Sequence, residues 1–314
     1  MKVIFMGTPD FSVGTLEALV RAGHEVVLAV TQPDKPKGRG KEVSFSPVKE
    51  KALELGIPVF QPRKIREKES VLELGKYEAD VMVVIAFGQI LPKEILTMTR
   101  YGCINVHASL LPKYRGAAPI QWAVIEGETV SGVTTMQMDE GLDTGDMIEK
   151  AEVVLDAKET GGSLHDKLAA EGAKLCVSTL DKIEKGTAVF TSQGESPTAY
   201  AKQLDKKLGE IDWTWPADKI ERLIRGLNPW PSAYTMWEDK VMKLWEAEVV
   251  REDSELAPGT IVRVDKKAFC VQTGKGMLRA LAVQIPGKKR METGAFLRGY
   301  HLEEGSNLGN TLRK

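Results

Sequence analysis

The chain has 314 residues, of which 28% are charged and 42% hydrophobic, and its formal net charge is −1. This length can bury a full core and predicts two domains, while the balanced charge excludes binding of nucleic acid through a global positive field. Three cysteines without a CxxC pair and only four histidines indicate free thiols and no zinc site, so we expect no metal.

The first predicted elements are short apolar runs that fit buried strands. Val3–Met6 is such a run, and it is too short for a signal peptide or a membrane span, so we expect a cytoplasmic protein. Glu25–Val30 and Asp80–Ala86 are further runs, separated by helical patterns. Strands that alternate with helices predict a Rossmann-like α/β domain with a parallel sheet. Gly7 and Gly14 do not form a GxGxxG pattern, so a nicotinamide cofactor is not expected.

The next segment places an amide and an imidazole close together. Asn105 and His107 end an apolar run, and side chains at i and i+2 of an extended chain project from the same face. Asp143, within MDEGLDTGDM, can supply a carboxylate that orients the imidazole. Such a set can assist attack on a carbonyl carbon and stabilise the resulting oxyanion. No Ser or Cys nucleophile is evident, so the attacking group has to come from a substrate.

Each of these three residues also has an ordinary structural interpretation. His107 can be a core histidine, and Asn105 can cap the following turn. Asp143 lies between glycines, where aspartate is common turn chemistry. The long segment Ser109–Pro119 favours function, because it combines special-backbone residues with a pair of cations that a plain surface loop does not need.

The remaining pattern changes character near residue 200. Gly132–Met138 and Met147–Val154 are predicted strands, and Gly162–Ile183 is a predicted helix. A polar connector follows, and then short strands indicate a small β-barrel. We therefore expect domains at 1–200 and 213–314, joined by a linker at 201–212. The second domain is predicted to contain a helix at Ala217–Arg225, strands at Lys240–Val250, Thr260–Val264, Ala268–Gln272 and Gly276–Val283, and a terminal helix at Glu292–Tyr300.

NVHASLLPKYRGAAPIQWAVI (Asn105–Ile125) resembles the signature of the folate-dependent formyltransferases, and the resemblance extends over nearly the whole chain. The basic segment TQPDKPKGRGK (Thr31–Lys41) is similar to the members that act on methionyl-tRNA, and relatives acting on small acceptors lack it. The other matching segments are Phe5–Phe11, Asp80–Pro92, Gly132–Met147 and Asn228–Thr235.

The resemblance implies a reaction and a second fold. A formyl group would pass from 10-formyltetrahydrofolate, as cosubstrate, to the α-amino group of methionyl initiator tRNA for translation initiation. Asn105, His107 and Asp143 would form the catalytic set, and the second domain would be an OB-like barrel that contacts tRNA. We expect a monomer that binds no membrane.

The expected folate site follows the third strand, because loops at the carboxyl ends of parallel strands face the usual ligand crevice. Apolar walls and backbone groups suit a flat pterin, although Phe87, Ile90 and Leu91 can equally be core. The resemblance implies that Ser109–Pro112 also contacts folate. The predicted folate-binding residues are Phe87, Gly88, Gln89, Ile90, Leu91, Ser109, Leu110, Leu111, Pro112, Asp139 and Leu142.

The expected tRNA contacts are basic side chains in three places. Cations on a glycine- and proline-rich backbone suit the phosphates of an acceptor stem, although composition alone fits a solvated loop. The resemblance favours the tRNA interpretation. The predicted residues are Lys35, Lys37, Arg39, Lys41, Lys206, Lys207, Lys288, Lys289 and Arg290.

Three other functions stay open at the level of sequence. A formyltransferase for a small amino acceptor, such as an amino sugar or a purine precursor, would not need the basic segment. A catalytically silent RNA-binding protein would not need Asn105, His107 and Asp143 intact. A folate hydrolase would use water in place of the amine.

Overall fold

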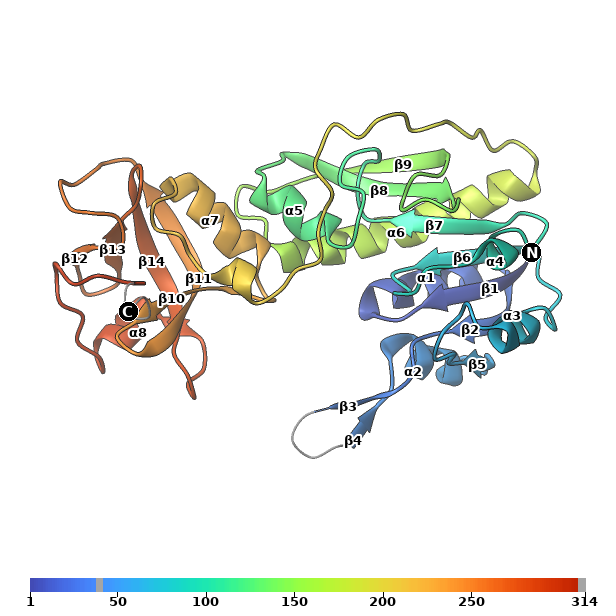
Figure 1. Ribbon diagram of the computed structural model, residues 1–314, viewed down its shortest axis with the longest axis horizontal. Coiled ribbons are helices and arrows are strands. Elements are labelled where there is room, and N and C mark those ends of the chain that lie inside the picture. Colours follow the sequence, from blue (N-terminus) through green and yellow to red (C-terminus); the bar gives the residue numbers. More distant parts are fainter. Residues whose placement is uncertain (38–41, 310–314) are drawn as a thin grey trace. The chain divides into compact units, whose positions relative to one another are not determined.

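The computed structural model describes residues 1–37 and 42–309, and the chain divides into two compact units (Figure 1). The first unit comprises Met1–Pro119, Val130–Val154 and His165–Ala201. The second comprises Ile120–Thr129, Leu155–Leu164 and everything from Lys202 onward. Two short segments from the range 1–200 therefore belong to the second compact unit. In the part of the chain described, no helix combines the length and the apolar character that crossing a membrane requires.

The described residues of the first unit form a seven-stranded sheet in the order β5-β2-β1-β6-β7-β8-β9. Strands β5, β2, β1, β6 and β7 pair in parallel, whereas β8 and β9 pair antiparallel, so the predicted α/β fold is confirmed with a mixed sheet. A short connection joins β8 to β9, and such connections suit antiparallel neighbours. The bounds are β1 Lys2–Gly7, β2 Glu25–Val30, β5 Val59–Phe60, β6 Val81–Ile85, β7 Cys103–His107, β8 Val130–Gln137 and β9 Met147–Val154.

Helices cover both faces of this sheet. On one face, Gly172 of α6 lies against Val106 and Val133, and Thr179 of the same helix hydrogen-bonds Thr135 of β8 at 2.8 Å between hydroxyls. On the other face, an apolar cluster joins alternate strand residues to α3 and α4. A small hairpin, β3 Lys35–Lys37 with β4 Glu42–Ser44, lies outside the sheet. The helices are α1 Asp10–Arg21, α2 Pro47–Glu54, α3 Lys68–Leu74, α4 Lys93–Leu96, α5 Pro119–Ile125 and α6 Gly161–Glu184.

Strand β7 is interior to the sheet, with β6 on one side and β8 on the other. Asn105 pairs with Val84 and with Met136, and His107 pairs with Thr134. Cys103 belongs to the apolar cluster on the α3 and α4 face. Because side chains alternate along a strand, Asn105 and His107 project from that same face.

The second unit is an antiparallel β-domain, which confirms the prediction that short strands form a separate β-domain after the α/β domain. Its strands follow the order β10-β11-β14-β13-β12, with β15 paired to β14. Buried aromatic side chains, including Trp213, Phe269 and Phe296, form its core. Strand β10 was not predicted, and the terminal helix is shorter than expected. The elements are η1 Lys207–Gly209, α7 Ala217–Gly226, β10 Ala233–Trp237, β11 Lys240–Val250, β12 Ile261–Val264, β13 Phe269–Gln272, β14 Met277–Gln284, β15 Met291–Glu292 and α8 Thr293–Leu297.

Candidate active site

The candidate site begins at the carboxyl end of β7. The side-chain oxygen Oδ1 of Asn105 is buried and has no hydrogen-bond partner among the described residues. Buried polar atoms in native proteins are nearly always paired, because an unpaired one costs about 1–3 kcal/mol. An unpaired amide oxygen at a strand end therefore indicates a place where a ligand donor completes the hydrogen bonding.

His107 is buried, and its ring is fixed by a neighbouring loop. Its Nε2 donates to the carbonyl oxygen of Tyr114 at 3.0 Å. A carbonyl oxygen only accepts, so Nε2 carries a hydrogen in both charge states of the ring. The nitrogen that gains or loses a proton is therefore Nδ1, which lies 3.8 Å from Oδ1 of Asp143.

Asp143 reaches the imidazole from the loop between β8 and β9. Its φ angle is 55°, in the left-handed region that aspartate tolerates better than most residues. Its Oδ2 accepts from the backbone N–H of Gly116 at 2.8 Å. Gly145 allows the loop to close, because a Cβ there would lie 1.7 Å from the carbonyl oxygen of Gln137. One carboxylate oxygen is thus held by backbone while the other faces His107.

The segment after β7 is bonded internally. Ser109 is buried, and its hydroxyl donates to the carbonyl of Lys113 at 2.6 Å. Thr134 of β8 donates to the carbonyl of Ser109 and accepts from the N–H of Leu111. Leu111 is buried, whereas Leu110 and Pro112 are half-buried. Of these four predicted folate residues, Leu110 and Pro112 retain exposed surface.

The loop after β6 contains both core and exposed side chains. Phe87 and Leu91 belong to the apolar cluster, so contact between either side chain and a ligand would require repacking. The Gln89 amide is used internally, since it accepts from the N–H of Ile65 at 2.6 Å and donates to the carbonyl of Pro62 at 3.1 Å. Ile90 is 77% exposed. Gly88 has a φ of 82°, which glycine adopts readily.

Two predicted folate residues lie on the Asp143 loop itself. The Asp139 carboxylate accepts from the N–H of Gly141 and from the Thr144 hydroxyl, so it shapes the loop. Leu142, next to Asp143, is 54% exposed. An exposed leucine beside the His107 and Asp143 pair is an apolar surface that a flat ring can cover.

Sequence reasoning missed the segment that follows α6. Gln193 donates to two carbonyls of the Asp143 loop, and Thr198 accepts from the N–H of Tyr114. Tyr200 lies beside Gly116, and burial, with a further contribution from Asp143, raises the pKa of its phenol. No local pattern identifies these residues, because their partners lie 48 or more positions away in the chain.

Two buried cysteines, Cys103 and Cys176, are unsuited to act as nucleophiles. Burial raises the pKa of the Cys103 thiol, at the start of β7, to about 12, so this thiol is protonated at neutral pH. Burial likewise raises the pKa of the Cys176 thiol, on α6, to about 12. Because the thiolate is the reactive form, neither residue offers an attacking group, which agrees with a nucleophile supplied by a substrate.

The predicted tRNA residues fall into separate groups. Lys35 and Lys37 lie on β3, whereas Arg39 and Lys41 lie outside the described residues. Lys206, Lys207, Lys288, Lys289 and Arg290 are all exposed in the second unit. The Arg290 guanidinium and the Lys243 ammonium each lie 5.6 Å from the ring centre of Trp245.

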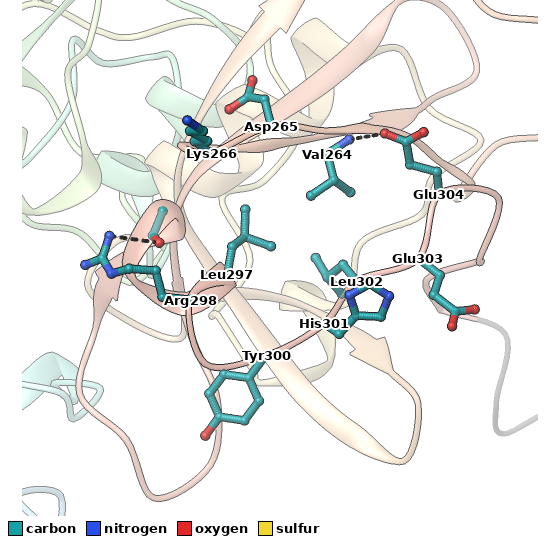
Figure 2. Close-up of a pocket in the computed structure, with 11 residues that line it drawn as sticks. Val264, Asp265, Lys266, Leu297, Arg298, Tyr300, His301, Leu302, Glu303 and Glu304 are labelled. Atoms are coloured by element: carbon teal, nitrogen blue, oxygen red, sulfur yellow. Dashed lines mark hydrogen bonds between the residues drawn. The ribbon is translucent and has the colours of Figure 1, made fainter.

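The second unit also contains a cleft of about 1050 Å³ beside α8 (Figure 2). Its lining mixes charges of both signs, with Lys266 and Arg298 opposed by Asp265, Glu303 and Glu304. Figure 2 shows the Glu304 carboxylate bonded to the N–H of Val264, and the Arg298 guanidinium, just after α8, bonded to the carbonyl of Gly294. The cleft has no amide, imidazole and carboxylate set, so we do not assign the reaction to it. Nor do three or more His, Cys, Asp or Glu side chains converge as a metal site anywhere in residues 1–37 and 42–309.

Comparison with known protein families identifies the family of this chain. A family model for formyl transferase matches residues 1–180, and a model for the formyl transferase C-terminal domain matches residues 203–301. The chain belongs to the formyl transferase family. Relatives within this family include the methionyl-tRNA formyltransferase of Agathobacter rectalis, which is 64% identical over 98% of this chain and 99% of its own length. The methionyl-tRNA formyltransferase of Lachnospira eligens is 56% identical over 98% of this chain and 100% of its own length.

Solved structures share the fold of this formyl transferase at low identity. An N-formyltransferase from Helicobacter canadensis, in complex with folinic acid and dTDP-3-aminofucose, superposes with a TM-score of 0.66 at 17% identity, covering 89% of this chain and 98% of that one. HypX from Aquifex aeolicus, in complex with tetrahydrofolic acid, gives a TM-score of 0.63 at 18% identity, covering 95% of this chain and 47% of that one.

Proposed function

We propose that this enzyme transfers the formyl group of 10-formyltetrahydrofolate to the α-amino group of methionine on initiator tRNA. The observation that carries the proposal is the group of side chains around the carboxyl end of β7, where Asn105, with its unpaired Oδ1, lies two residues before His107, which faces Asp143. Relatives up to 64% identical over almost the full length are named methionyl-tRNA formyltransferases. The chemistry and the acceptor thus rest on independent grounds.

The reaction joins an amine to a formyl carbon. The neutral α-amine attacks, a carbon–nitrogen bond forms, and negative charge develops on the former carbonyl oxygen. Collapse of this intermediate breaks the bond to N10 of the folate. The amine nitrogen loses a proton and N10 gains one, so the products are a formamide and tetrahydrofolate.

The side chains divide this work between them. The amide of Asn105 donates to the developing oxyanion, and such a donor is typically worth about a hundred- to a thousandfold in rate. Nδ1 of His107 exchanges the proton, because Nε2 is occupied by the Tyr114 carbonyl. The Asp143 carboxylate stabilises the charged imidazole across 3.8 Å. No metal ion has a role in this proposal.

The folate cosubstrate is proposed to lie against the loops around this set. Ile90 and Leu142 offer exposed apolar surface, and the backbone of Gly88 and of the Asp143 loop offers polar groups. Phe87, Gln89, Leu91, Ser109, Leu111 and Asp139 shape these loops through their buried or internally bonded side chains. Folate analogues should therefore protect the Asp143 loop from proteolysis.

The acceptor tRNA is proposed to meet the basic segment Lys35–Lys41 and the exposed cations of the second unit. Arg39→Ala should weaken productive use of tRNA and leave folate affinity intact, because phosphate contacts position the acceptor stem. Bound initiator tRNA should also slow tryptic cleavage in this segment. We further propose that the enzyme acts as a cytoplasmic monomer. Light scattering can check the monomeric state.

The test is an acceptor comparison with 10-formyltetrahydrofolate as donor. Formylation removes the positive charge of the methionyl amine, so product separates from methionyl-tRNA on an acid-urea gel. We expect folate-dependent conversion of methionyl-tRNA and little formylation of a nucleotide-linked amino sugar. Efficient formylation of the amino sugar, with no formylation of methionyl-tRNA, would contradict the proposal that tRNA is the acceptor. Release of tetrahydrofolate at an equal rate without any acceptor would indicate a hydrolase.

A further inference from the structure

Gln193, in the segment after α6, is built into the loop that presents Asp143. Its side chain is 8% exposed, and its Nε2 donates to the carbonyl oxygens of Asp143 at 2.9 Å and of Gly145 at 2.6 Å. Its Oε1 accepts from Nε of Arg115 at 3.0 Å. Arg115 in turn donates through Nη2 to the carbonyl of Gly194 at 2.8 Å.

This arrangement fixes which way the amide points. A carboxamide nitrogen carries two hydrogens, which matches two carbonyl acceptors on either side of Thr144. A guanidinium only donates, so the oxygen of the amide must face Arg115. Both carbonyls belong to a loop in which Asp143 adopts a φ of 55°. A backbone in this region is costly and persists when its surroundings hold it in place.

The same segment also supports the other catalytic side chain. The Thr198 hydroxyl accepts from the N–H of Tyr114 at 2.7 Å, and the carbonyl of Tyr114 holds Nε2 of His107. Ala201 exchanges backbone hydrogen bonds with Arg115 and Ala117 on that loop. Residues 191–201 thus contact both the Asp143 loop and the Tyr114 loop, while the strand residues need no such support.

We propose that Gln193 is a positioning residue for formyl transfer, which holds Asp143 at the distance and angle that stabilise the charged His107. Gln193 donates to the backbone that carries Asp143, so its effect on the reaction is expected to pass through Asp143. The inference rests on the proposed function, because it assigns Gln193 a part in that same reaction. If Gln193 had a purely structural role, its replacement would lower thermal stability, and the resulting loss of rate would be the same whether or not Asp143 is present.

The test compares Gln193→Ala and Gln193→Glu with the wild-type enzyme and with Ser192→Ala as a matched control. Ser192 is the exposed neighbour of Gln193. The Glu variant keeps the shape of the side chain and loses both hydrogens, so carboxylate oxygens face the two carbonyls. Displacing a catalytic group by about 1 Å can cost about a hundredfold in rate. We therefore expect kcat to fall about ten- to a hundredfold in both variants, with unchanged KM for folate and for methionyl-tRNA. Ser192→Ala should match the wild type.

The deciding measurement repeats Gln193→Ala in an Asp143→Asn background. If Gln193 acts through the carboxylate, Gln193→Ala should lower kcat by less than about threefold in the Asp143→Asn background, since coupled residues show non-additive effects. An equal fold loss in both backgrounds would overturn the proposal, and so would an unchanged kcat or a loss confined to KM. If Gln193→Ala does not fold, Gln193→Glu takes its place in the same cycle. A wild-type enzyme without formyl transfer would instead refute the function, which separates the two failures.

Discussion

The proposed catalytic residues stand on two kinds of backbone. Asn105 and His107 lie on β7, where ladder hydrogen bonds to β6 and β8 fix the strand on both sides. Asp143 lies in a loop with a left-handed backbone, held by the N–H of Gly116 and by Gln193, which are 27 and 50 positions away in the chain. Regular pairing with neighbouring strands therefore determines the geometry of the strand residues, whereas individual contacts with distant residues determine that of the loop. Changes to the strand side chains should act on chemistry, and changes to the loop backbone should act on chemistry and on local structure.

The largest effect is expected on the strand. Asn105→Ala and His107→Ala should each fold, bind folate and lose about a hundred- to a thousandfold in formyl transfer, because each removes a group that meets the reacting atoms. Single-turnover rates with methionyl-tRNA, together with folate binding by fluorescence, measure this. Near wild-type turnover would remove the residue concerned from the mechanism.

The loop carboxylate should come next. Asp143→Asn keeps the shape of the side chain and the hydrogen bond from Gly116, but a neutral amide cannot stabilise a charged imidazole. We expect a loss of about a hundredfold in kcat with little change in melting temperature. Full activity with an unaltered pH profile would show that the carboxylate and His107 are not coupled.

A backbone change in the loop should have a smaller effect on rate and a clear effect on stability. Gly145→Ala places a Cβ 1.7 Å from the Gln137 carbonyl oxygen, so the loop must shift. We expect a destabilisation of about 1–3 kcal/mol by urea unfolding and a drop of about tenfold in kcat.

Gly14→Ala is the matched control for this change. Gly14 lies in α1 with no atom within 4 Å of an added Cβ, so alanine should stabilise the helix by about 0.5–1 kcal/mol and leave activity unchanged. Equal behaviour of the two variants would mean that Gly145 imposes no close contact.

The smallest effect on catalysis is expected for a basic patch of the second unit. Reversing the charges of Lys288, Lys289 and Arg290 together should weaken binding of any tRNA and reduce the salt dependence of that binding, since each lost phosphate contact lowers the slope by about one. The rate at saturating tRNA should stay unchanged. A slowed single-turnover rate at saturation would place these residues in positioning the acceptor.

The same contrast explains what the sequence could predict. The apolar runs that became β1, β2 and β6 stand out because strands buried on both faces are continuously hydrophobic. The two-residue spacing of Asn105 and His107 likewise predicted a shared face. β10 was not predicted, nor was the antiparallel direction of β8, since its pairing with β7 is a tertiary choice. No local sequence pattern points to Gln193, because its proposed role depends on carbonyl groups that lie 48 and 50 positions away in the chain.

The central claim is that the strand and the loop form one catalytic unit, and a double-mutant cycle between His107 and Asp143 tests it most directly. The measurement is the single-turnover rate of formyl-methionyl-tRNA formation for the wild type, His107→Ala, Asp143→Asn and the double variant. If Asp143 acts by stabilising the charged imidazole, the double variant should be no slower than His107→Ala. Rate losses that multiply in the double variant would contradict the account, because they would show that the two residues act independently.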